Sequence, residues 1–551
     1  MYRGVLMGVS EGARVPVLIV GAGPSGLLAA AELARHGVRA RIVEREPVPP
    51  REARATALQP GTLEILAQAG VVSQVLLSSV HLRYARVLDP ELKPVAETDF
   101  AGVGCPWEFQ CSLPQWRTEQ ILAGRLAEHG VVVDRGTEVV SMDDDGDRVL
   151  VTLKRADGTT EIVEADWVIG AGGAHSVTRE SMAVDLTGDT YPGTALVADV
   201  RVTCPIARDG SALIASPGGY VLLAPLPDGH WLTFVGDLHE DEAERLEHDI
   251  SIGAVAGAIQ RRAPDAIRLT DVGWAATFRM HRRLAPELAD ARRFLLGDAG
   301  HLSSPFGGEG LNSGLHDAHN LAWKLALEVQ GRARPALIDS FAAERGAAAR
   351  HVLETSDRLH QLVHAAVESA RTGSRGAAPS PEQARALLRA RSMLDVCYAG
   401  SALAAEYTAP GNAAPEDAAS VPAASVPAAC VPAGSVPAAA VQPRPGDRYP
   451  ARASLTGTGH HLLLSGNIDA DAAARMTRRW AGLVDVGAGA GESGTGQSGT
   501  GGPAAGDPAG PGGPGVLLIR PDGYIGFRAP EADAAALRTL DAHLASYLIP
   551  A

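Results

Sequence analysis

The sequence predicts an α/β protein of several domains, and three features of the chain support this fold class. A short apolar strand beginning at Val15 runs into a glycine-rich turn and an alanine-rich helix, and a second strand follows. Residues 191–277 carry short runs with the alternation of antiparallel strands. The chain has 551 residues, and domains usually hold about 100–200, so about three domains are expected.

Composition and charge exclude several classes of partner. The formal net charge is −15 and is spread along the chain without a basic stripe, which argues against nucleic acid. The first residues do not resemble a leader peptide, and an uninterrupted apolar run of about 18 residues is lacking, so a cytoplasmic protein without a membrane span is expected. The five cysteines match neither a metal site nor a redox pair, and we expect reduced thiols and no metal: Cys105, Cys111, Cys204, Cys397 and Cys430.

The N-terminal strand, turn and helix carry a dinucleotide-binding pattern of the Rossmann type. The strand VPVLIV is followed by GAGPSG and then by LLAAAELARHG, and VRARIVE forms the next strand. Within GxGxxG, Gly21 permits a tight turn, Gly23 lets the backbone approach a pyrophosphate, and Gly26 allows close helix packing. Glu44 ends the second strand, where a carboxylate can accept hydrogen bonds from a ribose diol. Pro24 and Ser25 open the helix, whose N–H groups face the anion.

The rest of the chain divides by pattern into further segments. We predict a nucleotide-binding domain over residues 15–190 and 278–408, interrupted by an antiparallel β-sheet domain over 191–277. The second part of the nucleotide-binding domain contains long helical segments after RRFLLGDAGH. Repeats of the type SVPAA predict a Pro/Ala-rich linker over 409–444. A small α/β domain over 445–551 follows, interrupted by a Gly/Pro/Ser tract that we expect to be a disordered loop.

Longer segments resemble a known family. RRFLLGDAGHLSSPFGGEGLNSGLHDAHNLAWKLA is similar to the GD motif of the para-hydroxybenzoate hydroxylase family of FAD-dependent monooxygenases. REARATALQPGTLEIL, LPQWRTEQIL and a degenerate DG-type motif, VIGAGGAHSVTR, match the same family. The tail from RPGDRYPARASL to RPDGYIGFRA resembles the thioredoxin-like C-terminal domain of aromatic polyketide hydroxylases. The resemblance therefore extends over nearly the whole chain.

The resemblance implies a set of FAD-binding residues. Glu44 and Arg45 would hold the adenosine, Arg54 would meet phosphate, and Gln115 would reach the ribityl chain. Asp298 would hold the ribityl and pyrophosphate side. The other cofactor-binding residues that the family pattern implies are Val139, Gly308, Gly310, Leu311 and Asn312, with the last two supplying backbone N–H groups at a helix N-terminus.

The resemblance also implies the reaction. Electrons from NADPH or NADH would reduce the FAD, and O₂ would then form a flavin C4a-hydroperoxide that hydroxylates a phenolic ring. The expected substrate is a polycyclic aromatic polyketide. Pro305 and Phe306 would lie on the flavin face. The substrate would lie between the flavin and the antiparallel domain, where Tyr220, Leu222, Trp231 and Phe234 are either contact residues or ordinary core. For His301, packing and hydrogen bonding are expected rather than catalysis.

Three positions depart from the family pattern. Gly172 and Gly173 stand where Asp-Gly is usual, and His175 replaces an Arg. We therefore expect nicotinamide-driven reduction to be the weak step. Glu309 replaces the usual Gln and adds a carboxylate beside the flavin-face loop.

Two other functions remain open. The scaffold would equally support a Baeyer–Villiger oxygenase, or a flavin-binding accessory protein without redox turnover. Every flavin motif precedes residue 320, so we expect the part after Pro443 to be dispensable for FAD binding. The sequence does not indicate an oligomeric state.

Overall fold

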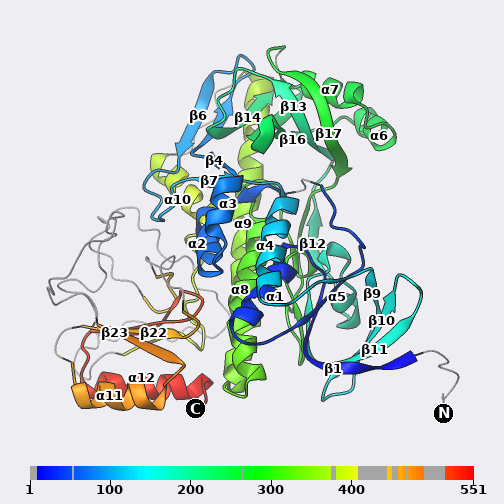
Figure 1. Ribbon diagram of the computed structural model, residues 1–551. Helices are drawn as coiled ribbons and strands as arrows, with labels where there is room; N and C mark the ends of the chain where they lie inside the picture. Colours follow the sequence, from blue (N-terminus) through cyan, green and yellow to red (C-terminus); the bar gives the residue numbers. More distant parts are fainter. Residues whose placement is uncertain are drawn as a thin grey trace. The chain divides into compact units, whose positions relative to one another are not determined.

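The computed structural model divides into two compact units (Figure 1). It describes residues 9–52, 55–263, 265–373, 380–407, 444–449, 457–465, 468–488 and 515–550. Unit 1 comprises Met1–Ala322 and Ala349–Leu394, and unit 2 comprises Trp323–Ala348 and Asp395–Ala551. The predicted long helical segments form α8 (Gly310–Val329) and α9 (Pro335–Thr372). The division between the units falls within both helices, and the sequence pattern did not predict that division.

Unit 1 contains the predicted nucleotide-binding sheet. Strand β1 (Val9–Val20) lies between β2 (Arg41–Glu44) and β11 (Thr160–Gly170), and all three are parallel. Helix α1 (Pro24–Arg35) connects β1 to β2, as the βαβ pattern predicts. The remaining strands of this sheet are β8 (Asp134–Arg135), β9 (Thr137–Asp144), β10 (Val149–Arg155) and β19 (Arg293–Leu295). The parallel strands end beside the glycine-rich turn, where open α/β sheets bind ligands.

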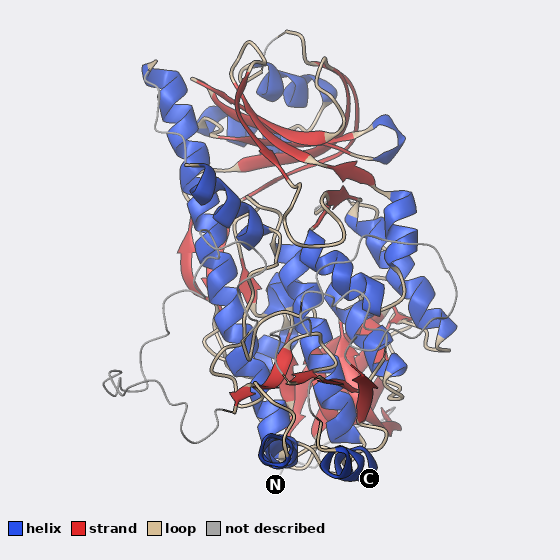
Figure 2. Cartoon of the chain, turned by 90° about the vertical axis from the view of Figure 1, so that its left-hand side faces the viewer, coloured by secondary structure: helices blue, strands red, loops and turns tan. Residues whose placement is uncertain are grey.

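A second sheet, also of seven strands, lies at the other end of unit 1, with short helices on its far side (Figure 2). Its order is β17-β13-β16-β15-β14-β5-β6. Five strands come from the predicted insert: β13 (Ala195–Thr203), β14 (Gly210–Ser216), β15 (Gly219–Pro225), β16 (Trp231–Gly236) and β17 (Arg268–Phe278). The other two, β5 (Tyr84–Leu88) and β6 (Pro94–Asp99), precede the insert by about a hundred residues, and β5 pairs in parallel with β14. The boundary at residue 191 therefore omits part of this sheet.

The two faces of this sheet pack against different partners. Leu196, Ala198 and Val200 share a core with residues of α6 (Glu240–His248) and α7 (Ile252–Gln260). Ala195 and Val197 point to the opposite face, because side chains alternate along a strand. The second face is the one available to the rest of unit 1.

Shorter elements complete unit 1. Two three-stranded sheets join distant segments: β3 (Ala57–Leu58) with β7 (Gln110–Ser112) and β4 (Val80–Leu82), and β12 (Thr187–Thr190) with β18 (His281–Leu284) and β20 (His301–Leu302). The helices are α2 (Pro60–Gln68), α3 (Val72–Ser78), α4 (Gln115–Glu128), α5 (Val177–Ser181) and α10 (Pro381–Arg391), with 3₁₀ turns η1 (Gly173–His175), η2 (Pro227–Gly229) and η3 (Gly297–Ala299).

Unit 2 combines the C-terminal α/β domain with the C-terminal part of α8 and the N-terminal part of α9. Its sheet has the order β21-β25-β24-β22-β23. The strands are β21 (Ala405–Glu406), β22 (His460–Leu464), β23 (Val484–Ala488), β24 (Val516–Ile519) and β25 (Ile525–Ala529), and the helices are α11 (Ala470–Arg479) and α12 (Ala534–Tyr547). Trp323 of α8 and Leu337 of α9 belong to the same hydrophobic core as Leu462 and Leu518. The C-terminal domain therefore shares its hydrophobic core with residues of α8 and α9, while its dispensability for FAD binding remains a prediction.

A buried group of ion pairs reinforces unit 2. Arg520 binds both carboxylate oxygens of Glu344, at 2.6 and 2.8 Å, and also pairs with Asp522. Lys324 donates to the same Glu344 at 2.7 Å. Burial alone would raise the pKa of Glu344, but Arg520 and Lys324 outweigh it and hold the pKa well below its usual range. The two cations and two anions balance, which a buried cluster requires.

Candidate functional site

The glycine-rich turn adopts the geometry that its sequence predicts. Gly21 has φ +106°, and a Cβ there would lie 2.4 Å from the Ala171 carbonyl oxygen. A Cβ at Gly26 would lie 2.1 Å from the Gly21 oxygen, so only glycine lets α1 pack this close. A Cβ at Gly23 would meet no protein atom within 4 Å. The chain therefore needs Gly21 and Gly26 for its own packing, whereas Gly23 leaves open space for a ligand.

Glu44 and Ser25 fix the neighbouring parts of this turn. The Glu44 carboxylate accepts hydrogen bonds from the Ala22 N–H at 2.8 Å and from the Glu46 N–H at 3.0 Å. Ser25 Oγ lies so close to Gly297 and Gly314 that a Cβ at either would come within 2.8 or 2.3 Å of it. The Ser25 side chain thus packs against both η3 and α8 at the start of α1.

Asp317 and His301 stabilise the turn that presents Asp298. The Asp317 carboxylate accepts hydrogen bonds from the Gly297 N–H at 2.9 Å and lies 2.7 Å from His301 Nε2. Both side chains are buried, while Asp298 is exposed to the cavity described below. His301 is the packed, hydrogen-bonded residue that we expected.

The loop from Pro305 to Gly308 is anchored by Asn312 and Gln59. Asn312 Nδ2 donates to the carbonyl oxygens of Ala57 and Gly308, and its Oδ1 accepts from the Gln59 N–H at 2.9 Å. Gln59 Nε2 donates to the Gly307 oxygen at 2.6 Å. The Asn312 side chain thus holds the loop, and the expected ligand contact would fall to its backbone N–H. Helix α8 begins at Gly310, so the backbone N–H groups of Leu311 and Asn312 lie in its first turn.

These segments border one cavity of about 1770 Å³ within unit 1. One part of its wall comes from the dinucleotide-binding elements: Gly23, Pro24, Ser25, Arg45, Gln115, Gly172, Gly173, His175, Asp298, Pro305, Phe306, Gly308, Glu309, Gly310 and Leu311. The opposite part is apolar and comes from the antiparallel sheet: Val197, Leu213, Ala215, Leu222, Leu232, Phe234, Trp274, Ala276 and Phe278. Ligand pockets usually measure about 300–1,000 Å³, so this cavity has room for two ligands side by side.

The four candidate substrate contacts separate into two groups. Leu222 and Phe234 are register partners on β15 and β16, and both line the cavity. Tyr220 is buried between Phe234 and Phe306, with its ring centroid 5.4 Å from that of Phe306. Trp231 belongs to the core on the other face of the sheet. Tyr220 and Trp231 are therefore core residues.

The segment that departs from the family pattern also borders the cavity. Gly172 has φ −78° and ψ 10°, which any L-residue can adopt, and a Cβ there would make only ordinary contacts, the nearest at 3.7 Å. Gly173 has φ +75° and favours glycine. A side chain at position 172 is thus sterically possible.

The remaining predicted cofactor residues differ in their position. Gln115 begins α4 and donates from Nε2 to Glu119 at 2.9 Å, and Arg45 is exposed beside Glu46. Val139 is buried in the core of the nucleotide-binding sheet and is not one of the cavity-lining residues. Arg54 lies outside the residues that the structure describes.

Two helices supply cavity residues that the sequence analysis missed. Leu359, Leu362, Val363 and Ala366 come from α9. Their helical spacing marks an apolar face, but the sequence did not show what that face covers. From α10, Arg391 reaches the wall, where its side chain donates to Gln110 at 3.1 Å. Burial lowers the pKa of Arg391, and the nearby charge of Glu309 opposes that shift.

Within the described residues, no helix is long and apolar enough to cross a membrane. The same part of the chain contains no group of three or more His, Cys, Asp or Glu side chains with the geometry of a metal site. Four cysteines are free thiols, and Cys430 lies outside the described ranges.

Comparison with family models identifies both parts of the chain. A model described as an FAD binding domain matches residues 14–356, and one described as the C-terminal part of aromatic-ring hydroxylases matches residues 434–550. The chain is 37% identical to the 6-methylpretetramide 4-monooxygenase of Streptomyces rimosus over 341 residues, which cover 60% of this chain and 58% of that protein. A 12-dehydrotetracycline 5-monooxygenase/anhydrotetracycline 6-monooxygenase of the same species is 30% identical over 62% of this chain and 69% of its own.

Solved structures match over nearly the full length. An anhydrotetracycline hydroxylase from Streptomyces rimosus has a TM-score of 0.71 and 26% identity, covering 98% of this chain and all of the other. An aklavinone-11 hydroxylase, solved with FAD and aklavinone, has a TM-score of 0.75 and 25% identity, covering 97% and 99% of the two chains.

Proposed function

The chain belongs to the para-hydroxybenzoate hydroxylase type of FAD-dependent aromatic monooxygenases, and on that premise we propose that it hydroxylates a polycyclic, phenolic substrate. The overall reaction converts an aromatic C–H group, O₂, NAD(P)H and one proton into a phenol, water and NAD(P)⁺. NADPH or NADH as the electron donor is part of this proposal.

The observation that carries the proposal is the shape of the cavity. The same hollow runs from the open space before Gly23 to the apolar wall that contains Leu222, Phe234 and Trp274. Its volume of about 1770 Å³ exceeds what one ligand needs, so a dinucleotide and a large planar molecule fit together. An apolar wall suits fused rings, because their burial is favoured by about 25 cal/mol for each Å² removed from water.

The residues in the cavity wall fit FAD. Gly23 and the first turn of α1 offer open backbone to a pyrophosphate, and Asp298 and Gln115 offer polar groups further along. Glu44 is not a lining residue, but it ends β2 beside the same turn, where a ribose would lie. When bound, FAD supplies the hydride acceptance and oxygen activation that no side chain provides. Arg54 remains a proposal for the phosphate part, and Val139, which is buried in the sheet core, remains a proposed cofactor residue without an assigned contact.

The chain's own residues would bind, orient and exclude water. Pro305 and Phe306 border the cavity on the dinucleotide side, and Asn312 and Gln59 hold their loop in place. The sheet residues would align the ring to be oxidised, and the enclosing apolar surface would keep water away from the reacting atoms. Substrate recognition would thus depend on shape and apolar contact more than on charge.

The proposal is tested by turnover with a panel of tetracyclic phenols under ¹⁸O₂. We expect a yellow protein with one FAD per chain, consumption of NADPH, and a product that carries one ¹⁸O atom as a new phenol in its NMR spectrum. A lactone instead would establish Baeyer–Villiger oxidation. Bound FAD that NADPH does not bleach under anaerobic conditions, with every panel member present, would support a non-redox accessory role.

The FAD assignment is tested separately through Asp298. Asp298→Ala should lose FAD occupancy, measured as the ratio of flavin to protein absorbance. Asp228→Ala is a suitable control, because Asp228 is an exposed carboxylate in η2. Full occupancy in Asp298→Ala would contradict the assignment.

A further inference from the structure

Two histidines on α9 lie in direct contact next to the cavity. His360 Nε2 and His364 Nε2 are 2.9 Å apart, and the ring centroids are 4.6 Å apart. A single proton fits between these nitrogens, so one ring donates and the other accepts. The pair is therefore a hydrogen bond with a defined direction that reverses when both rings exchange tautomers.

The inner end of this pair reaches the cavity wall. His360 Nδ1 lies 3.3 Å from Ser304 Oγ, and Ser304 is fully buried within the cavity wall next to Pro305 and Phe306. His360 is buried, with the Tyr191 ring stacked on it at 4.0 Å and the Phe306 ring edge-on at 5.1 Å. These rings exclude water from the inner nitrogen and fix its orientation.

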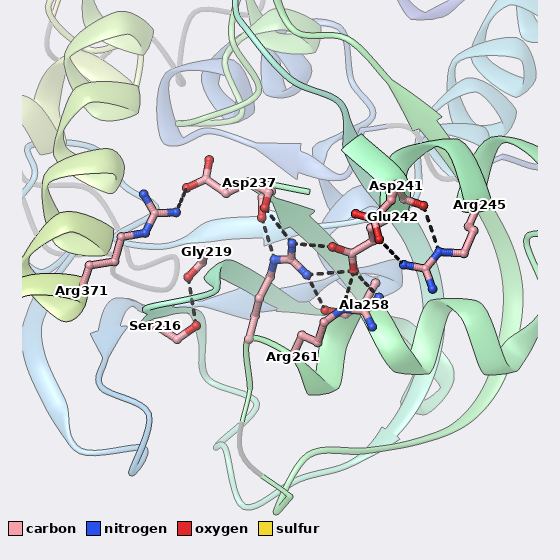
Figure 3. A network of polar contacts seen from close by, with 11 residues as sticks. Ser216, Gly219, Asp237, Asp241, Glu242, Arg245, Ala258, Arg261 and Arg371 are labelled. Carbon is pink, nitrogen blue, oxygen red and sulfur yellow. Dashed lines mark hydrogen bonds and ion pairs between the residues drawn. The ribbon is translucent and has the colours of Figure 1, made fainter. Parts of the chain in front are cut away.

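The outer end reaches solvent. The His364 side chain is 44% exposed, and its Nδ1 lies 3.9 Å from Asp237. Asp237 pairs with Arg371 at 3.6 Å, and Figure 3 shows these two side chains facing each other. The Asp237 backbone oxygen also accepts a hydrogen bond from buried Arg262. A fixed carboxylate thus stands beside the exposed imidazole.

The charges around His360 keep it able to relay a proton. Burial and then His364 lower the pKa of His360 to about 4, while Asp357 and Asp237 act in the opposite direction. Asp357 is itself held by the Tyr191 hydroxyl at 2.6 Å and by Arg282 at 3.5 Å. A neutral imidazole has one N–H and one free lone pair, which is what a relay requires.

We propose that Ser304, His360 and His364 form a proton path between the cavity and solvent. A ligand hydroxyl in the cavity gives its proton to Ser304 Oγ as the serine proton moves to His360 Nδ1. The proton on His360 Nε2 then moves to His364 Nε2, and the proton on His364 Nδ1 leaves to water. One proton crosses the wall, and the ligand becomes a phenolate, whose ring is more electron-rich. The role in hydroxylation rests on the proposed function, whereas the path itself does not.

The test follows ionisation rather than turnover. The holoenzyme without nicotinamide is mixed in a stopped-flow cell with 1,2-dihydroxyanthraquinone, whose visible band reports its ionisation. We expect the bound probe to ionise with a solvent deuterium isotope effect. His364→Ala should slow this step at least about tenfold, since positioned acid–base groups contribute about 10²–10⁴-fold. Added imidazole should restore the rate, which it would not do if His364 only supported the fold.

Two further variants make the test decisive. His248→Ala removes an exposed histidine from α6 and should leave the ionisation rate unchanged. His360→Phe should slow ionisation without changing probe affinity by more than about threefold, and if it does not fold, His364→Ala with imidazole decides. An unchanged rate and isotope effect in His364→Ala, or a wild-type protein that does not ionise the probe, would overturn the path. Ionisation without any hydroxylated product would instead count against the proposed function alone.

Discussion

At the scale of single residues, the structure shows which of positions 172 and 173 could carry a side chain. Gly172 stands where the family pattern has a carboxylate, yet its backbone angles and surroundings would accept a side chain. Gly173, with φ +75°, would not accept one without strain. Position 172 therefore has room for the carboxylate of the family pattern, whereas position 173 favours glycine.

Gly172→Asp should restore that carboxylate. We expect faster anaerobic reduction of the bound flavin by NADPH, or tighter NADPH binding, with FAD affinity nearly unchanged, measured by stopped-flow absorbance. Gly172→Asn is the matched control, since it fills the same space without charge. If both variants fold, remain yellow and reduce no faster than wild type, the missing carboxylate does not limit reduction.

Glu344 is a second residue whose role the structure defines. It is the common acceptor for Lys324 and Arg520, so Glu344→Gln leaves an excess buried cation. We expect a loss of about 3–5 kcal/mol in the free energy of unfolding. Glu406→Gln is the control, because Glu406 pairs with Arg528 at 3.6 Å at an exposed position and should cost less than about 1 kcal/mol. Equal losses in chemical denaturation would contradict a special role for the buried cluster.

At the scale of elements, the first βαβ unit is the part that sequence predicts best. Its strand, turn and helix depend on residues close together in the chain, and α1 begins where the pattern indicated. The antiparallel sheet was predicted only in part. Strands β5 and β6 join it through pairing between Tyr84–Leu88 and Gly210–Ser216, and no local pattern encodes that pairing.

The glycine-rich turn allows fold and ligand binding to be separated. Gly23→Ala should leave the fold intact, because its Cβ meets no protein atom, but should weaken FAD binding at least about tenfold, or about 1.4 kcal/mol. Gly21→Ala should instead destabilise the apoprotein, because of its positive φ and the contact with Ala171.

Thermal unfolding of apoprotein and FAD titration measure the two effects. Gly124→Ala, in α4 with open space around its Cβ, controls for glycine removal and should alter neither FAD binding nor the fold. Unchanged FAD affinity in Gly23→Ala would show that the pyrophosphate does not bind at this turn.

At the scale of the whole molecule, the hydrophobic core of unit 2 decides what can be deleted. A chain ending at residue 440 would lose the C-terminal strands that cover Trp323 and Leu337, and the Arg520 partner of Glu344. We expect such a chain to aggregate or to melt at a clearly lower temperature, measured by size-exclusion chromatography and calorimetry.

A shortened tract provides the control for that truncation. Deletion within residues 489–514, which lie outside the described ranges and are rich in Gly, Pro and Ser, should be tolerated. A soluble, yellow protein with wild-type stability that ends at residue 440 would show that the core of unit 2 is not required.

Four histidines should make stability depend on pH. Burial lowers the pKa of His36 and His460 to about 3, and that of His360 and His543 to about 4. Unfolded histidines titrate near 6.5, so between about pH 6.5 and 4 the unfolded chain binds more protons. Stability should therefore fall as the pH drops through this window, and unfolding should take up protons.

Calorimetry in buffers of different ionisation enthalpy measures that uptake. The melting temperature should decrease from about pH 7 to pH 5, and His543→Gln should reduce this dependence. His248→Gln, on the exposed face of α6, should leave it unchanged. A melting temperature that is constant over this range would show that the four rings titrate normally.

The sequence by itself determined the α/β class, the dinucleotide turn and its three glycines, and the family, because these depend on contiguous residues with fixed spacing. Only the tertiary structure decided which of the strand aromatics face the cavity, how α9 and α10 close it, and that Ser304 meets His360. It also decided that the C-terminal domain shares a core with α8 and α9. Each of these features joins segments tens to hundreds of residues apart, where packing rather than local pattern selects the partner.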